Sequence, residues 1–248
     1  MELRVYPEVS FTSKVYYALI RYNLMASSAM SRASRITLIH ATAVAMPPIA
    51  ESFRRLWKEA VVYNLLDDAL TPDLECHGGD VNAMAPRFTE LAQYAARGGS
   101  HGVLFTCSAF GPAVEAARMA VDIPLLKPNE AMIEEAAGYG QTIGLVATFE
   151  PALAPITAEF LEYAKESGVT LEVQPYLAAG AWEAIQNGDK DAHDRLVAQT
   201  CAKASACDVI CFAQFSMTTA QESSQQASGK RVLTTPDSAV RKLKALLS

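Results

Sequence analysis

The sequence predicts an α/β fold of two pseudo-symmetric lobes, each built on a mostly parallel sheet flanked by helices, with an active site between the lobes. Three observations lead to this prediction. Segments with the character of buried strands alternate with helical segments along the chain. Two pairs of strand segments repeat at nearly the same spacing. Several strands end in small polar residues or a thiol, and ligands bind at the carboxyl ends of strands in such sheets.

The composition narrows the class of protein. The 248 residues carry a formal net charge of −6, half of them are hydrophobic and 19% are charged, which is typical of a globular chain. The acidic balance and the lack of a basic cluster argue against a nucleic-acid partner, and no apolar stretch is long enough to span a membrane. The five cysteines are odd in number and include no C-x2-C pair. We therefore expect a cytoplasmic protein with neither a disulfide framework nor a structural zinc ion.

Three segments divide the chain: an amino-terminal arm at residues 1–34, a first lobe at 35–138 and a second lobe at 139–236. The arm belongs to a stretch from Val9 to Ala50 that has no acidic residue. It resembles a transit peptide, or it is an ordered or loose arm; we interpret it as an arm and leave it out of the fold prediction. The terminal helix, residues 237–247, is expected to be capped by Asp237 and can pack back on the first lobe.

The first lobe begins with a strand and alternates from there. Strands are predicted at 35–42, at 102–107 and, as a short edge run containing two prolines, at 122–128. Helices are predicted from 47 to 66, at 85–97, from 112 to 121 and at 130–137, with a glycine-containing loop at 76–80. Prolines open the first and third of these helices, Gly98 and Gly99 close the second, and Asn129 caps the fourth.

The second lobe repeats the alternation. Strands are predicted at 142–147, 169–173, 208–213 and 231–235, and helices at 151–166, 181–186, 190–206 and from 218 onward. An internal match links the two lobes: Ile36–Thr42 resembles Thr142–Thr148 at an offset of 106, and Val103–Cys107 resembles Ile210–Gln214 at an offset of 107. Two matches at nearly equal offset predict a duplicated unit. Two such units facing each other would bring the strand ends Thr42, Cys107, Thr148 and Gln214 to one cleft.

Cys107 is the residue around which we build the site. It ends a buried strand and faces a helix with Pro112 at its first position. The partial positive charge of a helix amino terminus favours a thiolate and also a bound carboxylate. A free cysteine can equally be a small buried apolar residue. We favour a functional role because of the position at a strand-to-helix turn.

The segments Phe105-Thr106-Cys107-Ser108 and Asp208–Met217, set in a duplicated unit, resemble the aspartate/glutamate (hydantoin) racemase superfamily, which also includes maleate isomerase and arylmalonate decarboxylase. The resemblance covers residues 35–247. Racemases of this family use one thiol on each face of the substrate carbon. Ser216-Met217 aligns the second cysteine position with Gln214, and an amide has no proton to exchange near neutral pH. Cys211 lies three residues earlier on the strand and faces the opposite side. Two-base racemisation is therefore not expected.

The resemblance implies a cofactor-independent isomerase that acts on a small carboxylate, amino-acid-like or dicarboxylic, through Cys107. Three reactions stay open: addition of the thiolate to an activated double bond, decarboxylation through an enediolate, and epimerisation with a second, unidentified residue. A carboxylate-binding protein without turnover is the alternative from another class. No G-x-G-x-x-G or G-x4-G-K-[ST] motif is present, so we expect no cofactor, and no metal site. Assembly into a homo-oligomer is left open.

The candidate substrate-binding residues lie near the strand ends. They are His40, Thr42, Thr106, Ser108, Thr148, Phe149 and Gln214. Thr106 and Ser108 could form an oxyanion pocket with nearby backbone N–H groups, or Ser108 could cap the helix. Phe110, Phe149 and Phe215 could form an apolar pocket wall or belong to the core. We interpret His193 as an exposed residue at a helix start.

Overall fold

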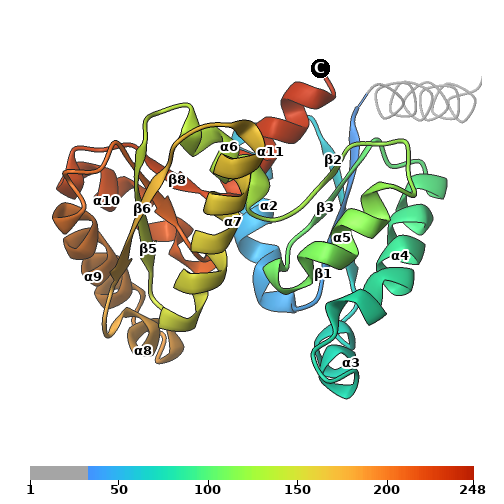
Figure 1. Ribbon diagram of the computed structural model, residues 1–248, viewed down its shortest axis with the longest axis horizontal. Coiled ribbons are helices and arrows are strands. Elements are labelled where there is room, and N and C mark those ends of the chain that lie inside the picture. The colour runs from blue at the N-terminus through green and yellow to red at the C-terminus, as the bar shows by residue number, and fades with distance from the viewer. Residues whose placement is uncertain (1–32) are drawn as a thin grey trace, which may run out of the picture.

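The computed structural model describes residues 33–248, so the predicted arm lies almost entirely outside the described residues. Each lobe is built on a four-stranded parallel sheet (Figure 1). The first sheet contains β1 (Arg35–His40), β2 (Val61–Leu66), β3 (Gly102–Phe105) and β4 (Leu125–Leu126), in the order β2-β1-β3-β4. The second contains β5 (Thr142–Ala147), β6 (Glu172–Leu177), β7 (Val209–Phe212) and β8 (Val232–Thr234), in the order β6-β5-β7-β8.

Helices connect the strands and cover the sheets. The α-helices are α2 (Met46–Leu56), α3 (Leu70–Cys76), α4 (Ala85–Arg97), α5 (Gly111–Arg118), α6 (Glu130–Ala137), α7 (Leu153–Ser167), α8 (Ala181–Gln186), α9 (Lys190–Lys203), α10 (Gln221–Ser228) and α11 (Thr235–Leu246). Short 3-10 helices are η1 (Ala43–Ala45), η2 (Val81–Met84), η3 (Ser108–Phe110), η4 (Glu150–Ala152) and η5 (Phe215–Ala220). The carboxyl ends of the strands of both lobes lie on the side of the molecule where α3 and α8 lie (Figure 1).

The central strands pair in the same register in both sheets. Ile36 of β1 pairs with Gly102, and Ile143 of β5 pairs with Val209, so a single offset of 107 relates both strand pairs. The backbone bonds beyond the strands repeat at the same offset, because Thr106 N donates to Ile39 O and Ala213 N donates to Val146 O. The predicted duplication is present, but the offset of 106 for the first strand pair was wrong by one residue. Alternating apolar residues match in more than one register, and only the backbone pairing settles which is real.

The helix that follows the last strand of each lobe packs against the other lobe. α6 follows β4 of the first sheet, yet its buried Met132 and Ile133 belong to the core under the second sheet. α11 follows β8 of the second sheet, and its Val240 and Leu243 pack in one cluster with Leu38 of β1 and with α2. The buried carboxylate of Asp237 on α11 accepts hydrogen bonds from α2 at this contact.

Several predicted elements differ from the structure. Residues 61–66 form β2 and not the end of a long helix, because the β-branched and aromatic run Val61-Val62-Tyr63 pairs with β1 over its whole length. Residues 70–76 form α3, which was not predicted from the sequence, and its last residue Cys76 was expected to begin a loop. β6 begins at Glu172, three residues later than predicted. The cap of α11 is Thr234, whose hydroxyl accepts from the backbone N–H of Asp237; Asn129 stands at the start of α6 without capping it.

Candidate active site

Four residues occupy equivalent places at the ends of the central strands. They are Thr42, Cys107, Phe149 and Gln214, following β1, β3, β5 and β7. Each has extended backbone and directly precedes a 3-10 helix. All four side chains are exposed or half-buried, whereas the residue before each is buried. The strand ends therefore present these four side chains, and the correct pairs are Thr42 with Phe149 and Cys107 with Gln214.

Cys107 is the one cysteine with a partly accessible side chain at the end of a strand. Cys201, Cys207 and Cys211 are buried, and Cys76 is exposed at the end of α3. Burial raises the pKa of the Cys107 thiol, and the hydrogen bond from the backbone of Ala109 offsets this only in part. The expected stabilisation of a thiolate by the helix amino terminus is therefore outweighed. The thiol is the dominant form near neutral pH.

His40 and Thr106 are buried inside the first lobe, beneath the strand end that carries Cys107, and are not exposed between the lobes. His40 is fully buried, and its Nε2 donates to Asn64 Oδ1 at 2.9 Å. Its Nδ1 then accepts from the Thr106 hydroxyl at 2.8 Å. Burial lowers the pKa of His40 despite the hydrogen bond to Asn64. Both ring nitrogens are used inside the lobe, so His40 and Thr106 hold the backbone that carries Cys107.

Gln214 and Thr148 form a second unit at the ends of β7 and β5. The backbone N–H of Thr148 donates to Gln214 Oε1 at 2.9 Å. This bond orients the amide and leaves its NH2 group to donate to a ligand. The Thr148 hydroxyl is buried and has no partner among the described residues, which is unusual for a buried polar group. Thr148 thus lies behind the strand end that Gln214 and Phe149 present.

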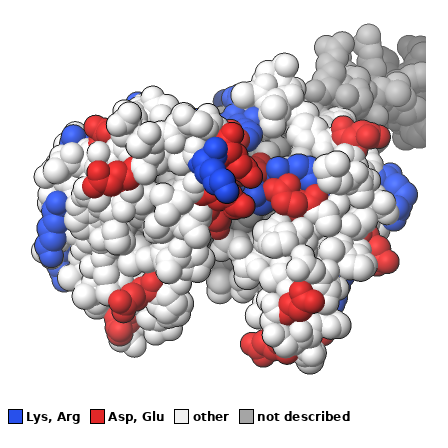
Figure 2. Space-filling model, viewed as in Figure 1, with Lys and Arg blue, Asp and Glu red and all other residues white. Residues whose placement is uncertain are grey.

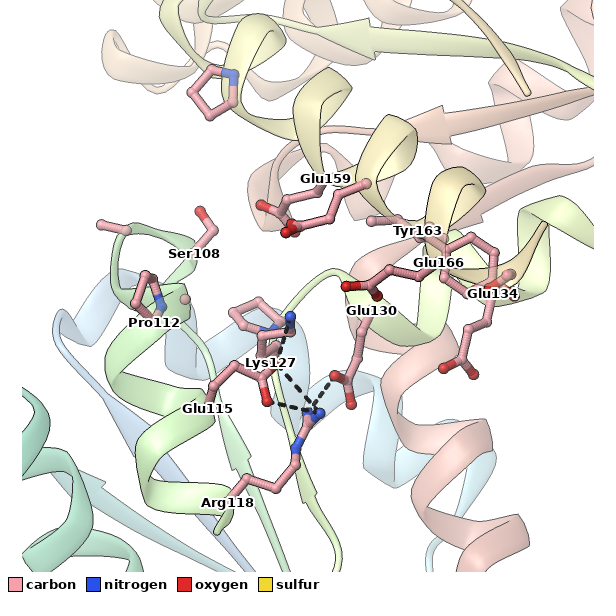
Figure 3. A pocket seen from close by; sticks show the side chains of 17 residues that line it. Ser108, Pro112, Glu115, Arg118, Lys127, Glu130, Glu134, Glu159, Tyr163 and Glu166 are labelled. Atoms are coloured by element: carbon pink, nitrogen blue, oxygen red, sulfur yellow. Dashed lines mark hydrogen bonds and ion pairs between the residues drawn. The ribbon is translucent and has the colours of Figure 1, made fainter. Parts of the chain in front are cut away.

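A cavity of about 700 Å³ lies between the lobes, and Ser108 is the first residue after Cys107 that lines it (Figure 3). Ser108, Ala109 and Pro112, which follow Cys107 in the chain, line one wall, and Pro155 and Glu159 of α7 line the other. Cys107 and Gln214 are not among the lining residues. Ser108 is exposed and caps no helix, since α5 begins after Phe110. Figure 2 shows the hollow between the lobes with acidic and basic side chains gathered along it.

The cations in the cavity are already paired with carboxylates. Lys127 Nζ lies 2.7 Å from Glu115, and Arg118 contacts both Glu115 and Glu130 (Figure 3). Glu159 on the facing helix accepts hydrogen bonds from Asn129, but burial raises its pKa. A substrate carboxylate would meet no free positive charge from Lys127 or Arg118. Neutral donors are the groups left to bind it.

The three phenylalanines near the strand ends have different places. Phe110 is fully buried and packs on Phe88, so it belongs to the core of the first lobe. Phe215 packs against the cluster that contains α2 and α11, where the two lobes meet. Phe149 alone is exposed, to 43%, and its ring lies 5.2 Å from that of Trp182 on α8. Sequence reasoning missed Trp182, because only the fold brings α8 beside the end of β5.

His193 is not exposed, contrary to the prediction. Its side chain is fully buried, Nδ1 bonds Asp194 Oδ1 at 2.8 Å, and Nε2 is buried without a partner among the described residues. The Thr219 hydroxyl of η5 also donates to Asp194 Oδ1, at 2.7 Å. Burial raises the pKa of Asp194, but hydrogen bonds from Lys190, His193 and Thr219 lower it overall. This network ties the start of α9 to the turn that follows Gln214.

Two other kinds of feature are absent between residues 33 and 248. No group of three or more His, Cys, Asp and Glu side chains in this range is arranged to hold a metal ion. No helix in the same range has the length and apolar character needed to cross a membrane.

Two parallel α/β lobes with a thiol at one strand end define a two-lobed enzyme fold of the racemase type. The chain belongs to the Asp/Glu/Hydantoin racemase family, whose model matches residues 36–243. A search of curated proteins by sequence finds no significant match.

Solved structures of similar fold include racemases and a decarboxylase. Allantoin racemase from Klebsiella pneumoniae has a TM-score of 0.67 and 17% identity over 87% of this chain and 88% of its own. Glutamate racemase isoform RacE1 from Bacillus anthracis has a TM-score of 0.63 and 14% identity over 86% of this chain and 81% of its own. Arylmalonate decarboxylase has a TM-score of 0.60 and 14% identity over 86% and 92%. At these identities the likeness concerns the fold.

Proposed function

We propose that the protein is a cofactor-independent isomerase that moves a proton at the carbon next to the carboxylate of a small amino-acid-like or dicarboxylic acid, with Cys107 as its acid–base residue. The position of Cys107 carries this proposal. Its side chain is partly accessible at a strand end, and the two residues after it line the cavity between the lobes. The free cysteines suit a reducing compartment, so we place the activity in the cytoplasm.

The proposed step is a proton transfer between carbon and sulfur. The thiolate of Cys107 takes the proton, the S–H bond forms as the C–H bond breaks, and the electron pair moves into the carboxylate as an enediolate. The NH2 group of Gln214 is a neutral donor suited to that charge. Isomerisation follows when solvent water delivers a proton to the opposite face of the carbon and the Cys107 thiol returns its proton to solvent.

Decarboxylation is a second candidate, favoured by two observations. Burial raises the pKa of Cys107, so its thiol is ready to donate a proton near neutral pH. The equivalent position of the other lobe holds Gln214, which cannot supply a second one. In this reaction the C–C bond to one carboxylate breaks and CO2 leaves. The electron pair of that bond stays on the substrate as an enediolate, which then takes a proton from the Cys107 thiol.

Solvent exchange tests the proposal. The protein is incubated in D2O with a panel of small mono- and dicarboxylates, and deuterium at the α-carbon is followed by NMR. We expect incorporation with one of these acids, and a fall of at least about 100-fold in Cys107→Ser, with no change in Cys76→Ser. CO2 release would point to the second candidate. Binding seen as a raised melting temperature, with neither exchange nor CO2, would contradict both and indicate a binding protein.

A further inference from the structure

The two lobes have lost their symmetry at the strand ends. At the first of the equivalent positions the first lobe presents the polar Thr42 and the second lobe presents Phe149. At the other position the first lobe presents Cys107 and the second presents Gln214. Duplication alone would give matching residues. The strand ends of the two lobes therefore offer different chemical groups.

Phe149 is the next residue in the chain after the backbone contact that orients Gln214. Phe149 follows Thr148, whose backbone N–H is bound by the side chain of Gln214. The ring is 43% exposed and contacts Trp182, with 5.2 Å between ring centroids and 37° between planes. Leu177, which is 39% exposed, ends the neighbouring strand and pairs with Ala147, two residues before Phe149. An exposed apolar residue alone is ordinary, but here an aromatic pair adjoins an oriented polar group.

The exposed ring is not explained by packing within the lobe. The other phenylalanines that follow strand ends, Phe110 and Phe215, are taken up by the core and by the contact between lobes. Phe149 is left partly open to solvent on the side where the strands of both lobes end. A ligand group that covers it would remove apolar surface of both partners from water, and two rings attract each other through edge-to-face or offset contacts.

We propose that Phe149 and Trp182 form the subsite for an aromatic or similarly bulky apolar substituent of the substrate, next to the carboxylate held by Gln214. The inference rests on the proposed function, because it takes the substrate to be a carboxylate at this cleft. It narrows the substrate class from small carboxylic acids in general to those with an apolar group close to the carboxylate. The first lobe supplies the sulfur, and the second lobe selects the substituent.

Binding of two matched pairs of probes tests this subsite. Succinate is compared with phenylsuccinate, and acetate with phenylacetate, by isothermal titration calorimetry. We expect the phenyl compound of at least one pair to bind about tenfold more tightly than its partner, in line with one aromatic contact. Phe149→Thr, which installs the residue of the equivalent position, should remove this preference because it weakens binding of the phenyl compound more than that of the smaller acid. Tyr94→Ala changes an aromatic residue that is 64% exposed on α4 and should have no effect.

A fluorescence measurement supports the same test without relying on a variant at Phe149. The chain has two tryptophans, and Trp57 is buried at 7% exposure. The phenyl probe should change the emission of the wild type and not that of Trp182→Phe. The subsite is wrong if the wild type shows no preference in either pair, or if Phe149→Thr keeps it. Cys107→Ser should retain the preference, so loss of exchange and loss of the subsite are separate outcomes.

Discussion

The backbone N–H of Thr148 donates a hydrogen bond of 2.9 Å to Oε1 of Gln214, and this bond joins the ends of the neighbouring strands β5 and β7. At the offset of 107 the equivalent residues of the first lobe are Ala41 and Cys107. Gln214 therefore occupies the position of a thiol but is held by the backbone of its own lobe. The second lobe offers an oriented donor where the first offers a sulfur.

Substitutions of Gln214 should separate its structural and binding roles. Gln214→Ala removes the acceptor of the Thr148 N–H and should lower the free energy of unfolding by about 1 kcal/mol. Gln214→Glu keeps an acceptor at that place but brings a negative charge toward the carboxylate of the ligand. We expect near wild-type stability and weaker carboxylate binding in Gln214→Glu, measured by urea unfolding and calorimetry. Equal binding by Gln214→Glu and the wild type would contradict the binding role.

The reactivity of Cys107 should rise only at alkaline pH. Because burial raises its pKa, the thiolate fraction near neutral pH is smaller than for a free cysteine. The rate of alkylation by iodoacetamide, measured by mass spectrometry in a Cys76→Ser background, should reach half its maximum above the range of an ordinary thiol. Cys76 in the wild type serves as the exposed reference. Fast alkylation of Cys107 at mildly acidic pH would show that the helix amino terminus outweighs burial.

Stability should depend on pH through His40. Burial lowers the pKa of His40 in the folded state, so between that pKa and about 6.5 the unfolded chain binds a proton that the folded chain does not. The contribution of His40 to the free energy of unfolding is therefore complete above about pH 6.5. It falls as the pH drops through this window, until the pKa of His40 in the folded state is passed. Urea unfolding at pH 8 and pH 5 measures the loss. It should shrink in His40→Gln and stay in His77→Gln, where an exposed histidine is changed.

A buried carboxylate fastens helix α11 to the first lobe. Asp237 is 1% exposed, and its Oδ1 accepts from the Ser52 hydroxyl at 2.6 Å and from Arg55 at 2.5 Å, both on α2. Arg55→Met leaves this carboxylate buried without its cation and should destabilise the fold by about 3 kcal/mol in urea unfolding.

Arg54→Met is the matched control for that substitution. Arg54 is 76% exposed and pairs with Glu51 at the surface, so its loss should cost less than about 1 kcal/mol. Equal stability of the two variants would show that the Asp237 contact contributes little to holding the lobes together.

The local pattern of the sequence was enough to predict most of the strands and helices, the duplication and the equivalence of Cys107 with Gln214. The alternation of apolar and polar residues and the positions of prolines and glycines affect only a few neighbouring residues, so they can be interpreted without the fold. The strand at 61–66 shows the limit. Its apolar residues continue the pattern of α2, and only pairing with β1 makes them a strand.

The tertiary structure decided which side chains the strand ends present. A shift of one residue turns a side chain to the other face of a strand. Phe149, and not Thr148, is therefore the residue of the second lobe that is equivalent to Thr42. Burial depends on segments far apart in the chain, which is why His40 and His193 lie inside a lobe and why Trp182 meets Phe149. The sequence by itself determined the two lobes and the residue types at their edges. Register and long-range packing decided which of those side chains the strand ends present.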